Sequence, residues 1–114
     1  MDLKITTEAN DGNCIVAVEG EVDIHSAPQL ERAITDAINA GHPTVTVDLS
    51  LVGFIDSSGL GALITALRQS EAANSKLILL SPQGAVERVL ALTGLDKMFV
   101  VHNSVDESNA ESDD

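Results

Sequence analysis

The chain has 114 residues, 44% of them apolar, which is enough to bury the core of one domain. Its formal net charge of −12, from 18 acidic and 6 basic residues, would be repelled by nucleic-acid phosphates and by anionic lipid. We therefore expect neither nucleic acid nor a bare membrane as a partner, and the single cysteine, Cys14, excludes an internal disulfide.

The amino-terminal residues predict a β-hairpin. Residues 3–8 and 13–19 have the composition and alternation of strands, and Cys14 falls at a position where we expect it to be buried. Between them, Asp11-Gly12 can supply the positive φ angles of a tight turn, so the two strands should run antiparallel.

A helix and a third strand follow. The helix carries signals at both ends: Ser26 as a cap, Pro28 in the first turn, and Gly41 at the left-handed position after the last turn. Residues 44–49, TVTVDL, are rich in β-branched side chains and predict a strand. A strand, a helix and a strand in this order form a right-handed crossover, so the second and third strands should be parallel.

The second half of the chain predicts a second helix, two strands and a third helix. The second helix should cover residues 57–73, with the buried stripe Leu60, Leu63, Ile64 and Leu67. A buried strand is expected at 76–80, a third helix between Pro82 and Gly94, and a short edge strand at 97–101. From Asn103 onward the sequence is polar and acidic, and we expect it to be frayed.

The segment before the second helix places an acid and two serines, Asp56-Ser57-Ser58, in front of Gly59 and Gly61. Ser and Asp side chains cap helices by accepting hydrogen bonds from free backbone N–H groups. Glycine inside a helix costs about 1 kcal/mol relative to alanine, and capping does not require it. We expect the two glycines to leave the backbone bare beside the serines, so that a partner can approach.

Three blocks of the chain resemble the STAS domain family, and most closely the bacterial anti-sigma factor antagonists. They are GEVDIHSAPQL (20–30), VDLSLVGFIDSSGLGALI (47–64) and KLILLSPQGAVERVLALTGLDKMF (76–99). The resemblance covers roughly residues 3–105. It implies an α/β fold in one domain: a mixed, mostly parallel sheet of four to five strands, with an amino-terminal antiparallel hairpin and three to four helices.

The resemblance also implies a function. Such an antagonist binds an anti-sigma factor that is itself a serine kinase, and thereby frees the sigma factor for transcription. The kinase phosphorylates one serine of the antagonist, which ends the binding, and a metal-dependent serine phosphatase removes the phosphate. The family's phosphorylated serine directly follows the aspartate, and this position is Ser57 here.

Several neighbours of Ser57 are expected to contact the partner. Ser58 is the rival phosphate acceptor, although a helix-start role fits it better. Asp23 can flank the same site or act only as a turn or cap acid. Phe54 and Ile55 can offer an apolar contact or be buried under the second helix. The predicted partner-binding set is Asp23, Phe54, Asp56, Ser57, Ser58, Gly59, Leu60 and Gly61.

No catalytic pattern accompanies these residues. DSSGLG lacks the spacing of a nucleophile elbow, GLGALI lacks the ending of a phosphate loop, and the histidines form no metal-ligand pair. We therefore expect no enzymatic activity, no metal and no cofactor. Two alternatives remain open: a cytoplasmic STAS component of a transporter assembly of the lipid-trafficking ABC type, and a small-molecule or nucleotide-binding module with a pocket near Asp23 and Ser57.

The prediction for the whole chain is a STAS domain over residues 1–105 and an acidic, disordered tail over 106–114. The first ten residues show no signal peptide, and no apolar run is long enough to span a membrane. We therefore expect a soluble cytoplasmic protein.

Overall fold

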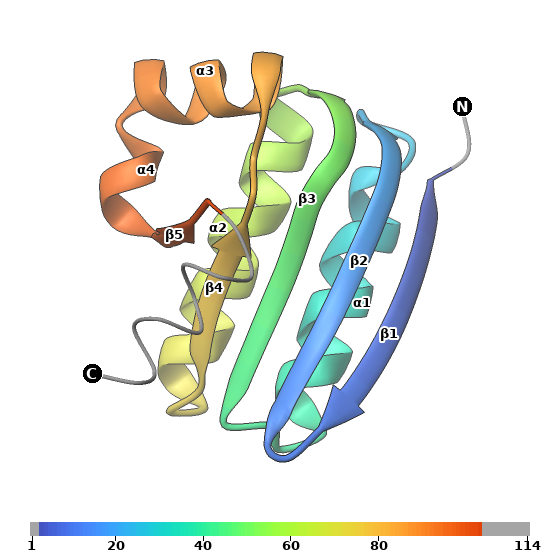
Figure 1. Cartoon of the computed structure of the whole chain (residues 1–114), viewed down its shortest axis with the longest axis vertical. Helices are drawn as coiled ribbons and strands as arrows, with labels where there is room; N and C mark the ends of the chain where they lie inside the picture. Colours follow the sequence, from blue (N-terminus) through green and yellow to red (C-terminus); the bar gives the residue numbers. More distant parts are fainter. Residues whose placement is uncertain (1–2, 104–114) are drawn as a thin grey trace.

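The computed structural model describes residues 3–103 and shows a five-stranded sheet with four helices (Figure 1). The predicted tail 106–114, and the predicted domain end at residue 105, lie outside the described residues. The elements are β1 Lys4–Asn10, β2 Asn13–Val22, α1 Ala27–Asn39, β3 Thr44–Ile55, α2 Ser57–Ala72, β4 Lys76–Leu80, α3 Gly84–Thr93, α4 Leu95–Met98 and β5 Val100–His102.

The strands are arranged in the order β1-β2-β3-β4-β5. β1 and β2 are antiparallel, and every other neighbouring pair is parallel. The mixed, mostly parallel sheet and its amino-terminal hairpin are therefore confirmed. Each parallel pair is joined by a helical crossover, so β2 and β3 end at the same edge of the sheet.

α1 and α2 pack against each other and cover one face of the sheet, behind the strands in Figure 1. α1 buries the side of Leu30, Ile34 and Ile38 that its 3.6-residue periodicity predicts. The core between these helices and the sheet is aliphatic, and Phe99 is its only buried aromatic residue within 3–103. The opposite face of β1–β3 carries neither helix.

The turn signals of the amino-terminal half are confirmed at two places and need correction at a third. Asp11 and Gly12 both have positive φ, as the hairpin requires, and Gly41 follows α1 with a φ of +94°. Ser26 stands at the cap position of α1, but its side chain makes no capping hydrogen bond. Its hydroxyl instead donates to the Glu21 carbonyl oxygen at 3.0 Å, which ties the loop back to β2.

β2 and β3 both continue past the predicted ranges 13–19 and 44–49. They end at Val22 and Ile55, which are registered with each other. The segment GEVD (20–23), which lies beyond the predicted strand 13–19, is therefore strand as far as its valine. The extension is stable because Val22, Val52 and Ile55 still bury their side chains on the core side.

The carboxyl-terminal elements are shifted relative to their predictions. α3 begins at Gly84, after the cap residue Gln83, rather than at Pro82, and it ends at the left-handed Gly94 as expected. The short helix α4 was not predicted. Because α4 takes up residues 95–98, the expected strand 97–101 begins later, as β5.

Candidate functional site

Ser57 is the first residue of α2, at the edge of the sheet where β2 and β3 end. Its side chain is exposed, and within residues 3–103 its hydroxyl makes no hydrogen bond. Ser58 is half-buried, and its hydroxyl also has no partner among these residues. Both hydroxyls are therefore free of hydrogen bonds to the described part of the chain, and Ser57 is the more accessible of the two.

The cap of α2 is Asp56, not a serine. Its backbone is extended, and its Oδ1 accepts hydrogen bonds from the N–H groups of Ser58 at 2.9 Å and Gly59 at 3.2 Å. The expectation that the serines cap the helix is thus wrong. Since Asp56 satisfies these amides, the Ser57 side chain is left available for another role.

We expect Asp56→Ala to lower the free energy of unfolding by about 0.5–2 kcal/mol, because two helix N–H groups lose their acceptor. Asp56→Asn keeps an oxygen acceptor and should recover most of the loss. Chemical denaturation followed by circular dichroism measures both variants. Equal stability of the alanine variant and the parent chain would show that the cap contributes nothing.

The two glycines of α2 differ, and the expectation of bare backbone is correct for only one. Gly59 is buried, and a Cβ at this position would lie 2.5 Å from Ile55 Cγ1 and 2.7 Å from Val22 Cγ1. Gly61 is exposed, and a Cβ there would meet nothing within 4 Å. Gly59 is therefore required for close packing of α2 on the sheet, and only Gly61 leaves open surface.

The buried face of α2 is made mainly of small residues rather than the predicted leucine stripe. Of that stripe only Leu63 is fully buried, whereas Leu60, Ile64 and Leu67 are partly buried at the margin of the core. The buried residues are Gly59, Ala62, Leu63, Ala66 and Ser70. The small side chains let α2 approach both the sheet and α1 closely, which fixes the position of Ser57.

Asp23 lies beside Asp56, as the parallel strand ends predict, because each follows one of the paired residues Val22 and Ile55. Its Oδ1 accepts hydrogen bonds from the N–H of His25 at 2.9 Å and of Ser26 at 3.1 Å. These two backbone donors hold the pKa of the Asp23 carboxyl below its usual value. Asp23 therefore remains charged at neutral pH and orders the loop, the turn role considered for it.

Phe54 and Ile55 point to opposite sides of β3. Gly20 is registered with Val52 but Glu21 with Phe54, so Gly53 is an extra residue, a β-bulge. The bulge reverses the alternation that follows it. Phe54 is consequently 45% exposed, and Ile55 is buried at 3%. Burial of Phe54 under α2 is thereby excluded, while Ile55 belongs to the core.

Sequence reasoning overlooked Leu51, which is 64% exposed on the same strand. The available signal was Gly53, since a glycine inside a strand pattern often marks a bulge. Two register shifts in β3, one between Asp48 and Leu51 and one at Gly53, place Leu51 and Phe54 on the same outward face of the strand.

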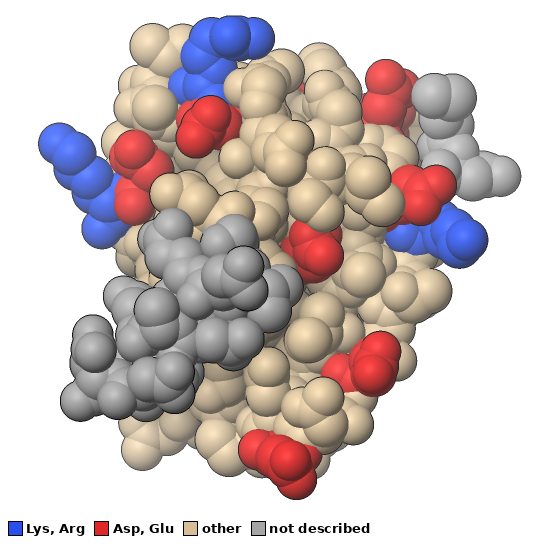
Figure 2. Space-filling view, in the orientation of Figure 1, with Lys and Arg blue, Asp and Glu red and all other residues tan. Residues whose placement is uncertain are grey.

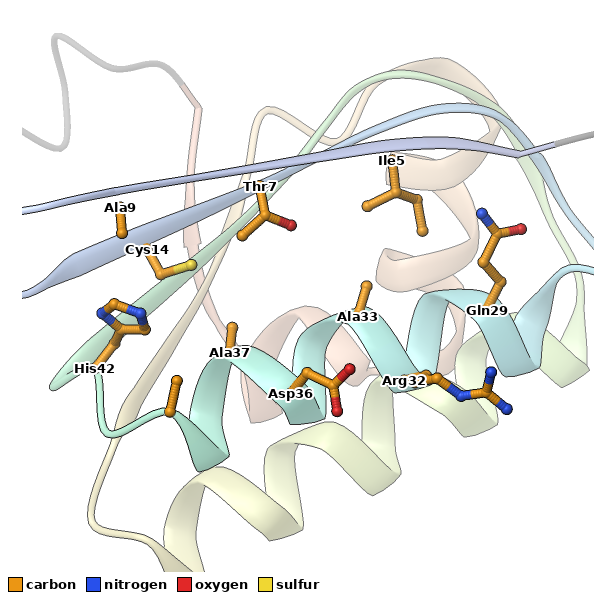
Figure 3. A pocket seen from close by; sticks show the side chains of 11 residues that line it. Ile5, Thr7, Ala9, Cys14, Gln29, Arg32, Ala33, Asp36, Ala37 and His42 are labelled. Atoms are coloured by element: carbon orange, nitrogen blue, oxygen red, sulfur yellow. The ribbon is translucent and has the colours of Figure 1, made fainter.

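The hollows of the surface give limited support to a ligand site beside the serines. An open hollow of about 600 Å³ between α1 and α2 includes Ser58 and Ile24 but is lined by neither Asp23 nor Ser57. Another, of about 520 Å³, lies between β1 and α1, with Cys14 in its floor and His42 at one end (Figure 3). Its lining residues come from β1, from Cys14 near the start of β2, from α1 and from the turn after it, and they include neither serine.

Residues 3–103 contain neither a candidate metal-binding group nor a helix suited to span a membrane. No group of three or more His, Cys, Asp or Glu side chains is placed to hold a metal ion. No helix in this part of the chain has both the length and the apolar composition needed to cross a membrane.

Comparison with known proteins identifies related sequences along nearly the whole chain. Residues 4–108 match the model of the STAS domain family. The anti-sigma-B factor antagonist of Staphylococcus aureus strain NCTC 8325 is 29% identical over 106 residues, which are 93% of this chain and 98% of that protein.

Solved structures share the fold. The crystal structure of an anti-sigma factor antagonist from Mycobacterium paratuberculosis is similar with a TM-score of 0.87 and 31% identity, over 99% of this chain and 96% of that one. The Bacillus cell fate determinant SpoIIAA in its phosphorylated form is similar with a TM-score of 0.72 and 25% identity, over 96% of this chain and 99% of that one.

Proposed function

The chain belongs to the STAS domain family, among its anti-sigma factor antagonists, and from this premise we propose that it is a phosphorylation-controlled partner of an anti-sigma serine kinase. Unphosphorylated, it binds the kinase and frees the sigma factor. Phosphorylated on Ser57, it no longer binds. The observation that carries the proposal is the exposed Ser57 hydroxyl, which makes no hydrogen bond within residues 3–103 and lies at the first position of a helix that Asp56 already caps.

The fold can accept a phosphate at this position. A phosphoryl group adds about −1.5 to −2 charges, and the amino end of a helix stabilises an anion by about 0.3–1 kcal/mol at an exposed site. The adjacent Asp56 carboxylate opposes the phosphate, but Ser57 faces solvent, where water and salt weaken this repulsion. Because the two effects are small and opposite in sign, the domain stays folded after modification.

The interface with the kinase cannot accept the phosphate in the same way. Contact with a partner removes the water around Ser57. The phosphate then lies close to the carboxylates of Asp56 and Asp23, and no water weakens the repulsion between these negative charges. The modification also adds bulk to a surface that must fit closely. Phosphorylation therefore changes the binding affinity and leaves the fold unaltered.

The remaining partners follow from this function. A metal-dependent serine phosphatase restores the Ser57 hydroxyl and closes the cycle, which operates in the cytoplasm. The chain itself acts as a regulator and as a substrate of both enzymes, with no chemistry of its own. The transporter-component alternative has no comparable support, because the Staphylococcus aureus relative and the Mycobacterium paratuberculosis structure both carry antagonist names.

Intact mass spectrometry of the protein isolated from its native cell tests the proposal. We expect a fraction of the protein to be heavier by about 80 Da, one phosphoryl group, with fragmentation placing the increment on Ser57. The Ser57→Ala chain expressed in the same cells should lack the heavier species. A protein unmodified at Ser57 under every growth condition would contradict the proposed switch.

A further inference from the structure

The first strand of the sheet leaves its outer edge unpaired. β1 stands at the end of the strand order and pairs only with β2, so within residues 3–103 no strand adjoins its other side. The opposite edge strand, β5, has three residues, whereas β1 has seven and pairs with β2 without a register shift. Proteins commonly keep edge strands short or irregular, because a long, regular edge pairs with other chains. β1 therefore offers a place for a further strand.

Half of the peptide groups of β1 face this open edge. The two residues that flank the Asp11-Gly12 turn form a hydrogen-bonded pair, as is usual for a two-residue hairpin loop. Alternation along an antiparallel ladder then turns outward the peptide groups of Ile5, Thr7 and Ala9. Just before the strand, the Leu3 carbonyl oxygen accepts a hydrogen bond from Nε2 of Gln29 at 3.1 Å. In the described part of the chain, nothing bonds to the outward groups that follow.

The charged side chains of β1 complement a second copy of the same strand. Lys4 and Glu8 are exposed, and neither has an ion-pair partner within residues 3–103. When two copies pair antiparallel about Thr6, Lys4 of each copy lies directly opposite Glu8 of the other. In the same register Ile5 lies opposite Thr7, so that their outward peptide groups bond to each other. Opposite charges placed directly across a ladder stabilise the pairing of the two strands.

The helix beside β1 adds a second complementary pair. Arg32 and Asp36 are exposed one turn apart on α1, at the rim of the hollow between α1 and β1 (Figure 3). A two-fold axis through Thr6 sets the two α1 helices antiparallel to each other on the same side of the sheet. It thereby brings Arg32 of one copy toward Asp36 of the other, across a hollow whose floor is largely apolar.

The charge balance of this edge selects its occupant. The whole chain carries a net charge of −12, and Figure 2 shows acidic side chains over the uncovered face of the sheet, with a basic one at the right-hand edge, where β1 lies. Along the edge Lys4 and Arg32 balance Glu8 and Asp36. A purely basic or purely acidic segment would leave two of these four groups facing a like charge. A second copy pairs all four, since each brings the same alternation in the opposite direction.

We propose that β1 is the surface through which two copies of the chain associate, so that one continuous sheet runs through both. The contact is isologous: the two-fold axis repeats each Lys4–Glu8 pair, and both copies use the same residues. Ser57 begins α2 after β3, two strands in from β1, so the pairing leaves both Ser57 side chains accessible. The association does not depend on the phosphorylation proposed above.

Sedimentation equilibrium of the purified full chain, from about 10 µM to about 1 mM in about 0.15 M salt, tests this inference. We expect a reversible dimer with a dissociation constant of about 100 µM or lower. Lys4→Glu or Glu8→Lys alone sets like charges opposite each other at both pairs and should weaken the dimer about ten-fold or more. The combined variant restores opposite charges and should return to within about three-fold of the parent chain. Circular dichroism checks that each variant is folded.

The matched controls make the same changes of charge away from β1. Lys97 on α4 and Glu71 on α2 are both exposed, so Lys97→Glu and Glu71→Lys should dimerise within about two-fold of the parent chain. A parent chain that stays monomeric up to about 1 mM would overturn the proposal. Single variants of β1 that dimerise like the controls would also overturn it, as would a combined variant that fails to recover. None of these results bears on phosphorylation of Ser57, which the mass measurement tests separately.

Discussion

Gly59→Ala is expected to lower the free energy of unfolding by about 1–3 kcal/mol, the cost of adding a methyl group to a filled core. The new Cβ would lie 2.5 Å from Ile55 Cγ1 and 2.7 Å from Val22 Cγ1, distances that real Cβ atoms do not tolerate. Both contacted atoms belong to buried strand residues, so α2 must move away from the sheet. Because Ser57 is the first residue of α2, the same substitution should also weaken kinase binding.

Gly61→Ala is the matched control. It lies on the same helix, but its Cβ would meet open space. Alanine there should therefore raise the free energy of unfolding by about 0.5–1 kcal/mol through helix propensity alone. Urea denaturation of the two variants and the parent chain measures both changes. Equal effects of the two substitutions on the free energy of unfolding would show that close packing at Gly59 does not limit the stability of the fold.

Ser57→Asp should weaken kinase binding by about 30-fold or more, while the circular dichroism spectrum stays that of the parent chain. The negative charge occupies an exposed position in the free protein but is desolvated beside Asp56 in the complex. Isothermal titration calorimetry against the purified kinase measures the loss.

Two further substitutions separate charge from bulk at Ser57. Ser57→Asn has nearly the size of aspartate without its charge and should retain a larger part of the affinity. Ser57→Ala should bind the kinase but accept no phosphate. Unchanged affinity of the aspartate variant would exclude charge at Ser57 as the cause of release.

Much of the fold is predictable from the sequence because its signals are local. Asp11-Gly12 and Gly41 mark turns by their positive φ, and the periodic apolar residues of α1 identify its buried face. The true end of β3 was missed because its stability depends on pairing with β2, which periodicity within one segment does not contain. α4 was missed for a similar reason, since a helix of one turn has too few residues for a periodic pattern.

The site was predictable in position but not in detail. The apolar periodicity of residues 57–73 placed Ser57 correctly at the start of a helix, and parallel strand order placed Asp23 beside Asp56. Gly59 was wrongly expected to leave bare backbone, because the helix considered alone shows only that glycine is less stable there than alanine. Its benefit lies in contacts with Val22 and Ile55, which belong to two other elements. Leu51 was missed because two register shifts against β2, one between Asp48 and Leu51 and one at Gly53, turn it outward beside Phe54, and alternation within β3 alone does not show them.

Control of binding by phosphate on Ser57 is tested most directly by one measurement: the affinity of the kinase for the chain before and after stoichiometric phosphorylation. The proposed function predicts a stable complex with the unmodified chain, a single phosphate on Ser57, and an affinity about 30-fold lower or worse afterwards. An affinity that phosphorylation leaves unchanged, or a phosphate found on Ser58 with Ser57 unmodified, would contradict it.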